Sequence, residues 1–232
     1  MDFSEGCSIC GEDLVYAQEH TLKQCTYCGA IADSNIQCPM GHFVCDACHS
    51  SSAVELIEKY CQQSLSIDPM KSAVMLMKSP VVKMHGPEHH FLVPAVLLTA
   101  YYNSLNEPET KIQKLSVARK RAESVHGGYC GTHGACGAAI GVGIFISIIT
   151  GTTPLKEQEW SLSNAITGEA LIEISKQGGP RCCKRDSFIV IKKAVEFLKT
   201  NLDFELPLTN VVCEFHKRNK QCRFDDCIYF PS

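Results

Sequence analysis

The sequence predicts a mainly α-helical chain in which a small cysteine- and histidine-rich module precedes a helical domain with glycine-rich cysteine loops. Three observations support this prediction. Cysteine is dense before residue 50, where a C-x2-C spacing occurs three times. After residue 50, apolar residues recur at helical intervals. No segment sustains the alternation of apolar and polar residues that is typical of a half-buried strand.

The N-terminal module contains eight soft or borderline metal ligands: Cys7, Cys10, Cys25, Cys28, Cys38, His42, Cys45 and Cys48. This number suits two tetrahedral zinc sites with no open coordination position. A segment this short buries too little apolar surface to fold alone, so bound metal would supply the folding energy. Because closed sites perform no chemistry themselves, we expect a structural role or docking to a protein partner.

The run from Cys25 to Cys48 resembles the central part of a RING-type cross-braced zinc finger, including its CPMGHFVC core. It departs from that family because the fourth ligand pair lies upstream of the run. Cross-bracing would place one zinc on Cys25, Cys28, Cys45 and Cys48, and the other on Cys7, Cys10, Cys38 and His42. Sequential pairing is the alternative, with one metal on Cys7, Cys10, Cys25 and Cys28.

Helical patterns occupy most of the remaining chain. We expect helices in SSAVELIEKYCQQSL, in KSAVMLMKS, in the segment after Pro87, and over Lys111–Val125, Leu162–Lys176 and Asp186–Thr200. The longest apolar run, from residue 138 to residue 150, is shorter than the roughly 18 residues of a membrane span. We therefore expect a buried core helix there and no membrane partner.

Glycine-rich loops open several of these helices and carry cysteine or histidine. The loop HGPEHH contains four candidate catalytic residues: His85, Glu88, His89 and His90. Two further candidates, Arg181 and Lys184, flank a pair of cysteines in GGPRCCKR. Helix N-termini offer free amides and positive potential, which favour thiolates and anionic substrates.

Seven cysteines in this part of the chain are candidate cofactor ligands: Cys130, Cys136, Cys182, Cys183, Cys213, Cys222 and Cys227. A 4Fe-4S cluster needs three or four thiolates, which need not be sequential. Three ligands would leave one iron open as a Lewis acid. A third zinc and unligated thiols are the alternatives. The predicted domains are a two-zinc Cys/His module over 1–50, a helical connector over 51–78 and a helical iron–sulfur-type domain over 79–232.

The charge of the chain and its first residues indicate which partners and which cellular compartment to expect. The net charge of −3 and the pI of about 6.3 provide no argument for binding to nucleic acid or to a membrane surface. The first ten residues, MDFSEGCSIC, have neither the basic start nor the apolar stretch of a signal peptide. We expect reduced thiols that bind metal in the cytoplasm.

The whole chain resembles an uncharacterised family from methanogenic archaea and other anaerobes, through HGPEHH, GACGAAIG, GGPRCCKRDSF and CEFHKRNKQC. The helical domain also resembles, in short motifs, the iron–sulfur L-serine dehydratases and cysteine desulfidases. CGAAIG and RCCKRD are similar to their cluster-binding motifs, and GPEHH is similar to their substrate loop. This resemblance implies that Cys136 and Cys182 or Cys183 ligate a cluster. The family's serine run and its C-D-P motif are absent.

Three functional hypotheses follow. The first is an iron–sulfur enzyme, a lyase or sulfur-transfer enzyme, acting on a small hydroxy- or thiol-bearing acid. In it His89 or His90 assists proton transfer, and Arg181 or Lys184 binds a carboxylate. The second is a non-catalytic scaffold or electron carrier that docks through the zinc module. The third is a nucleic-acid-modifying protein that uses HKRNKQCR, ranked last because two aspartates follow this run closely.

Overall fold

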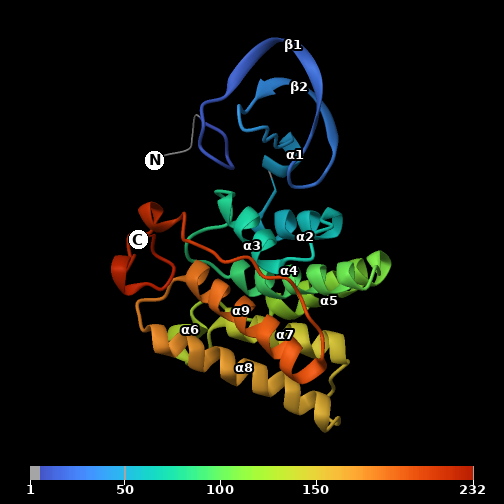
Figure 1. Cartoon of the computed structure of the whole chain (residues 1–232), viewed down its shortest axis with the longest axis vertical. Helices are drawn as coiled ribbons and strands as arrows, with labels where there is room; N and C mark the ends of the chain where they lie inside the picture. The colour runs from blue at the N-terminus through green and yellow to red at the C-terminus, as the bar shows by residue number, and fades with distance from the viewer. Residues whose placement is uncertain (1–5, 50, 232) are drawn as a thin grey trace.

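The computed structural model of the protein describes residues 6–49 and 51–231. Its fold is mainly α-helical, as predicted, with a small cysteine-rich module at one end of a helical body (Figure 1). The body contains α2 (Ala53–Gln63), α3 (Pro69–Lys78), α4 (Glu88–Ser104), α5 (Pro108–Glu123), α6 (Tyr129–Thr132), α7 (Gly137–Thr150), α8 (Gln158–Gln177) and α9 (Cys183–Leu202). None of the helices described is both long and apolar enough to cross a membrane.

The module is built around an antiparallel hairpin that the sequence pattern does not predict. Strands β1 (Val15–Gln24) and β2 (Ile31–Gln37) pair with an irregularity between Tyr16 and Thr21. Nearly every β1 residue is exposed, so there is no buried face and no alternation of apolar and polar residues to detect. The short helix α1 (Asp46–His49) ends the module.

The first two helices of the body have clear start signals. At α2, Ser52 and Glu55 form a reciprocal capping box. At α3, the Asp68 carboxylate accepts from the amides of Met70 and Lys71, and Pro69 occupies the first turn. The second Asp68 oxygen accepts from Thr209, in the segment after α9. The cap of α3 therefore also ties this helix to the C-terminal segment.

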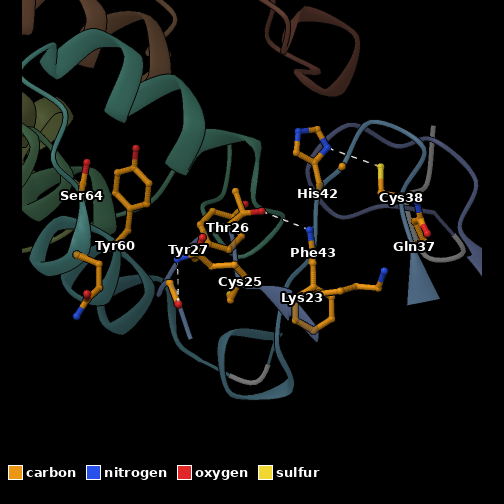
Figure 2. A pocket seen from close by; sticks show the side chains of 14 residues that line it. Lys23, Cys25, Thr26, Tyr27, Gln37, Cys38, His42, Phe43, Tyr60 and Ser64 are labelled. Atoms are coloured by element: carbon orange, nitrogen blue, oxygen red, sulfur yellow. Dashed lines mark hydrogen bonds between the residues drawn. The ribbon is translucent and has the colours of Figure 1, made fainter. Parts of the chain in front are cut away.

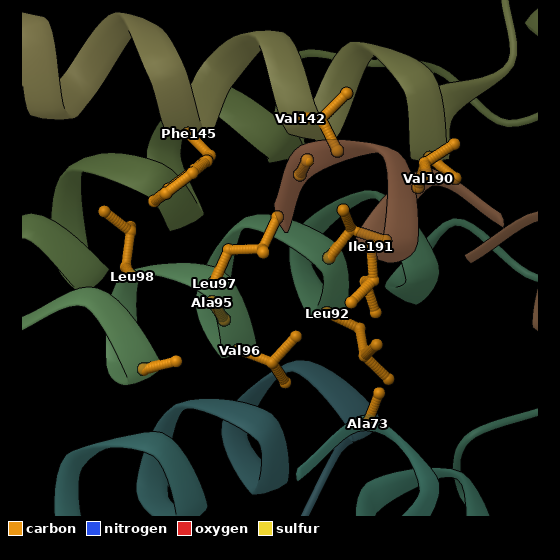
Figure 3. Close-up of a cluster of buried hydrophobic side chains, with 14 of the residues drawn as sticks. Ala73, Leu92, Ala95, Val96, Leu97, Leu98, Val142, Phe145, Val190 and Ile191 are labelled. Atoms are coloured by element: carbon orange, nitrogen blue, oxygen red, sulfur yellow. The ribbon is translucent and has the colours of Figure 1, made fainter. Parts of the chain in front are cut away.

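Helix α4 is the centre of the body. Its residues from Phe91 to Ala100 are all buried, because α2, α3, α5, α7 and α9 pack around it. Figure 3 shows Leu92, Val96 and Leu97 of α4 among side chains from α3, α7 and α9. A helix that is apolar on every side needs neighbours on every side, so α4 organises the layers around it.

Close packing of α7 on α4 depends on glycine. A Cβ atom added at Gly137 would collide with the ring of His90. One added at Gly141 would lie 3.0 Å from Pro94 Cδ and 3.1 Å from the His90 carbonyl oxygen. Pro94 has no N–H to donate to that carbonyl, and α7 approaches α4 at this point. The approach places the start of α7 beside His90, in the first turn of α4.

We predict that Gly141→Ala destabilises the protein by roughly 1–3 kcal/mol, because the contacting atoms are backbone and proline ring and cannot move aside. Gly168→Ala in α8 is the matched control. Its Cβ would meet nothing within 4 Å, so it should stabilise α8 by up to about 1 kcal/mol. Denaturant unfolding followed by circular dichroism measures both values. Equal effects of the two substitutions would contradict the packing argument.

Candidate metal centres

The eight ligands of the N-terminal module form two groups, each compact enough to bind a metal ion. One group contains Cys7, Cys10, Cys38 and His42, and the other contains Cys25, Cys28, Cys45 and Cys48. Within each group the ligand atoms all lie within 4.8 Å of one another. This is the interleaved arrangement; the sequential alternative does not occur.

Distances within the groups suit a tetrahedral ion. A Zn–S bond of about 2.3 Å gives a sulfur–sulfur edge of about 3.8 Å. The Cys10–Cys38 and Cys28–Cys45 sulfur pairs are 3.5 and 3.6 Å apart. The His42 Nδ1 atom lies 3.7 Å from the Cys38 sulfur and 3.8 Å from the Cys7 sulfur. An ion at the centre of either group would leave no open position.

A repeated glycine turn shapes these groups. Gly11, Gly29 and Gly41 all have positive φ, and each donates its N–H to the carbonyl oxygen of the first ligand of its turn. Only glycine adopts this backbone conformation without strain. The turns direct backbone amides toward the thiols. Although burial opposes ionisation, N–H groups of Cys45, Cys28 and Tyr27 lower the pKa of Cys25 to about 7.

The module is seated on α2. Leu56 of α2 is fully buried among module residues, and Tyr27 of the module is buried as well. Beside this contact a groove of about 560 Å³ runs between Tyr60 and Ser64 at the end of α2 and the ligands Cys25, Cys38 and His42 (Figure 2). Lys23, Tyr60 and Ser64 also line the groove, so polar side chains surround the edge of the two ligand groups.

A larger pocket, of about 970 Å³, lies at the start of α7 and α9. We call it the α7/α9 pocket. Its wall includes His85 from the loop before α4, Cys130 from α6, Cys136 at the N-cap of α7, and Arg181 from the loop before α9. Three sequence motifs that are far apart along the chain thus contribute to one cavity.

Two thiols lie at neighbouring helix starts: Cys136 lines this pocket, and Cys183, the first residue of α9, does not. Burial raises the pKa of Cys136 to about 11, and the nearby Asp186 carboxylate adds to the shift. Burial also raises the pKa of Cys183 to about 12, against an N–H donated by Gly86. The Cys136 thiol is close enough to Cys183 to contribute to that shift. Without a compensating cation these thiols stay protonated.

The two ring nitrogens of His85 have different surroundings. Its Nε2 lies 3.1 Å from the Asn219 Oδ1 atom and 3.0 Å from the Gln221 Oε1 atom, so this nitrogen carries the proton. Its Nδ1 is buried and has no hydrogen-bond partner among the described residues. Nδ1 therefore carries the lone pair of the ring, and it lies just below the surface of the pocket wall that His85 helps to form.

The other candidate catalytic residues have partners within the helical body. Both ring nitrogens of His89 are engaged, Nε2 with the Lys83 carbonyl at 2.9 Å and Nδ1 with Ser187 at 3.3 Å. His90 Nδ1 donates to the Val125 carbonyl, and Glu88 accepts from the Lys83 amide. Lys184 donates to the carbonyls of Met77 and Val82. Their local role is to hold loops in place.

Three residues of the site are absent from the motif-based prediction: Asp186, Asn219 and Gln221. Asp186 pairs with Arg185 at 3.1 Å, and both side chains are only 4% exposed. Its position four residues after Cys182, on the same helix face, is a usable sequence signal. Asn219 and Gln221 reach His85 from the C-terminal segment, and no local pattern indicates this contact.

Four of the candidate cluster ligands lie around a different cavity. Cys182, Cys213, Cys222 and Cys227 line a second, smaller cavity. No three ligands of the helical body, within the described residues, meet the compact spacing of the N-terminal groups.

We predict that the full-length chain binds two metal ions in the module when it is reconstituted with Zn²⁺. Cys25→Ser should remove one ion and expose residues 6–49 to hydrogen exchange, because the ions stabilise this segment. Cys61→Ala, which removes a buried thiol of the helical core, is the control and should retain both ions. Elemental analysis gives the counts. Retention of two ions by Cys25→Ser would contradict the assignment.

We predict that His89 makes stability depend on pH. Burial lowers its pKa to about 3, against about 6.5 in an unfolded chain. Its contribution is therefore complete above pH 6.5 and falls by up to ~1.4 kcal/mol per pH unit as the pH drops toward 3. His89→Gln should flatten the pH dependence of the unfolding free energy between pH 7.5 and 5. A His89→Gln variant that keeps the wild-type pH dependence in this range would contradict the prediction.

Comparisons with known proteins extend the assignment only as far as a family. No curated protein and no solved structure matches the chain. The comparisons therefore give no activity, and they provide no support for the dehydratase resemblance. Residues 57–230, three quarters of the chain, match a family of unknown function, and the module with its two ligand groups lies outside that match. The chain belongs to this family, DUF5714.

Proposed function

We propose that the protein is an iron–sulfur enzyme whose N-terminal module contains two structural zinc ions. The α7/α9 pocket would bind a small hydroxy- or thiol-bearing carboxylic acid for β-elimination or sulfur transfer. The observation that carries the proposal is the convergence of thiols, an unpartnered imidazole nitrogen and an arginine in one pocket. The N-terminal groups suit zinc because their ligands are sulfur-rich, tetrahedral and closed.

Cys130, Cys136 and Cys183 are the proposed cluster ligands. Their thiols come from two helix starts and one exposed turn, and they lack the compact spacing of a single-ion site. A cluster spans more widely spaced thiolates than one ion does, and three ligands leave one iron open as a Lewis acid. The N-termini of α7 and α9 add positive potential that stabilises the thiolates.

The remaining pocket residues would bind and orient the substrate. Arg181 is exposed at the pocket wall and can bind a carboxylate with two parallel hydrogen bonds. His85 Nδ1 would accept a proton, while Asn219 and Gln221 fix the ring by holding Nε2–H. Asp186, paired with Arg185, raises the pKa of the neighbouring Cys136 and Cys183 thiols, so their thiolates would form only where a bound cationic centre offsets the charge.

The alternatives have less support. An electron carrier would have no use for an unpartnered imidazole nitrogen and an exposed arginine beside its thiols. In the basic run 216–223, Arg223 donates to the Gln177 carbonyl and Arg218 lies over the Phe215 ring, 5.3 Å from its centroid. This side-chain packing removes much of the patch that nucleic-acid binding would require.

The test is anaerobic reconstitution of the full chain with iron and sulfide, followed by titration with L-serine, L-cysteine and related acids. We expect Cys136→Ser to lose iron. Arg181→Gln should retain the iron but bind the acid roughly 10–150-fold more weakly, because a charged hydrogen bond contributes about 1.5–3 kcal/mol. The readout is the ligand-induced change in the electron paramagnetic resonance spectrum.

Arg121→Gln on α5 is the matched control, because this arginine donates to Ser147 at the far end of α7. His85→Asn should bind both iron and acid yet lose turnover. If no acid perturbs the spectrum of the iron-loaded protein, the enzyme proposal fails and the electron-carrier alternative takes its place.

A further inference from the structure

A second group of thiols surrounds a small cavity that the proposed reaction does not use. Cys182 contributes from the N-cap of α9, and Cys213, Cys222 and Cys227 contribute from the segment after that helix. The cavity measures about 20 Å³. This exceeds the roughly 10–15 Å³ that one water requires, so the four cysteines surround a space instead of filling it.

Hydrogen-bond donors are directed at three of these sulfurs. The Asn219 side-chain amide donates to Cys182 at 3.6 Å. The backbone N–H groups of Phe215 and Phe224 donate, each at 3.4 Å, to the sulfur two residues before them. A neutral thiol is a weak acceptor, whereas a thiolate is a strong one. The same kind of donor faces a ligand sulfur in the module, where the Cys45 amide donates to Cys25.

The surroundings also suit a charged and enclosed group. Arg185 and Arg223 line the cavity and offset the charge of several thiolates. Phe188 and Tyr229 pack edge-to-face at 5.4 Å and form an apolar part of the wall. The Cys213 amide donates to the Tyr229 carbonyl at 2.7 Å, which joins the two ends of the segment.

The four thiols do not meet the 4.8 Å spacing that the module ligands meet, which favours a cluster over a single ion. In the same chain, two ligand groups have the compact spacing of a tetrahedral ion, and this one does not. Four thiolates around a small cavity match the ligand set of a 4Fe-4S cluster with no open position. We propose that Cys182, Cys213, Cys222 and Cys227 bind a closed 4Fe-4S cluster, separate from the centre in the α7/α9 pocket.

This centre would fix the C-terminal segment against the start of α9. Asn219 and Gln221 lie between Cys213 and Cys222, and their side-chain oxygens hold His85 Nε2. The cluster would thereby position the histidine of the pocket without contacting a substrate.

The test counts iron, acid-labile sulfide and zinc in the anaerobically reconstituted full chain. We expect the double variant Cys222→Ser/Cys227→Ser to lose about four irons per chain relative to wild type while retaining its zinc. Cys61→Ala should lose none. If the pocket centre also exists, Cys136→Ser loses a different set of irons. If it does not, wild type holds only about four irons and the double variant holds none, so the two proposals fail independently.

A thiol footprint of the wild-type protein keeps the test decisive if the double variant does not fold. Alkylation with iodoacetamide followed by peptide mass spectrometry should show Cys182, Cys213, Cys222 and Cys227 protected together in the loaded protein. All four should become reactive together after anaerobic removal of iron by a chelator. Unchanged iron in the double variant, independent reactivity of the four thiols, or a third zinc in place of iron would each overturn the proposal.

Discussion

Four consecutive polar residues, Lys184 to Ser187, are buried at the start of α9, and the loops around the pocket are arranged by the need to pair them. An unpaired buried charge is strongly destabilising, so each side chain requires a partner. Lys184 reaches carbonyls at the end of α3 and just after it, and Arg185 reaches the Gly178 and Pro180 carbonyls as well as Asp186. Ser187 meets His89 of α4. The start of α9 thereby holds in place the segment after α3, the loop before α9 and the first turn of α4.

The same helix start separates two thiol environments. Cys183 lies beside Gly86 and the Cys136 thiol, whereas Cys182 lies beside Asn219 and the C-terminal cavity. Adjacent residues in an N-cap and a first turn project in different directions, which explains how a Cys-Cys pair can serve two sites. The N-terminal module differs from the helical body, because only a small apolar cluster supports it. Metal bound by its two ligand groups would therefore contribute much of its stability.

The packing of α7 on α4 connects this chemistry to the core. Gly137 and Gly141 allow α7 to contact α4 at Pro94, and this contact places Cys136 next to the loop of His85 to His90. Glu88 folds back over Gly86 and accepts from the Lys83 amide, so a side chain at position 86 would collide with the carboxylate. Gly86 and Gly137 therefore leave room for the Glu88 carboxylate and the His90 ring, and Gly141 for the α4 backbone, which brings thiols and histidines to one place.

Local patterns in the sequence determined a large part of this protein. Apolar periodicity predicts helices close to the observed ones, because it is a local signal that repeats within one or two turns. Ser52 and Asp68 cap two of these helices in the structure. Cysteine spacing predicts the eight ligands of the module. It left their pairing open, since interleaved and sequential groups use the same turns. The hairpin was missed because both its faces are exposed.

Only the tertiary structure decided which distant residues meet. It brought the module ligands together in interleaved groups, and it placed two of the seven later cysteines on the α7/α9 pocket and four on the smaller cavity. It also left His85 Nδ1 without a partner among the described residues while engaging both nitrogens of His89. The contacts of Asn219 and Gln221 with His85 span more than 130 residues. Such contacts follow from the burial of α4 and the pairing of charges at α9, which are properties of the whole packed core and leave no trace in a short segment of sequence.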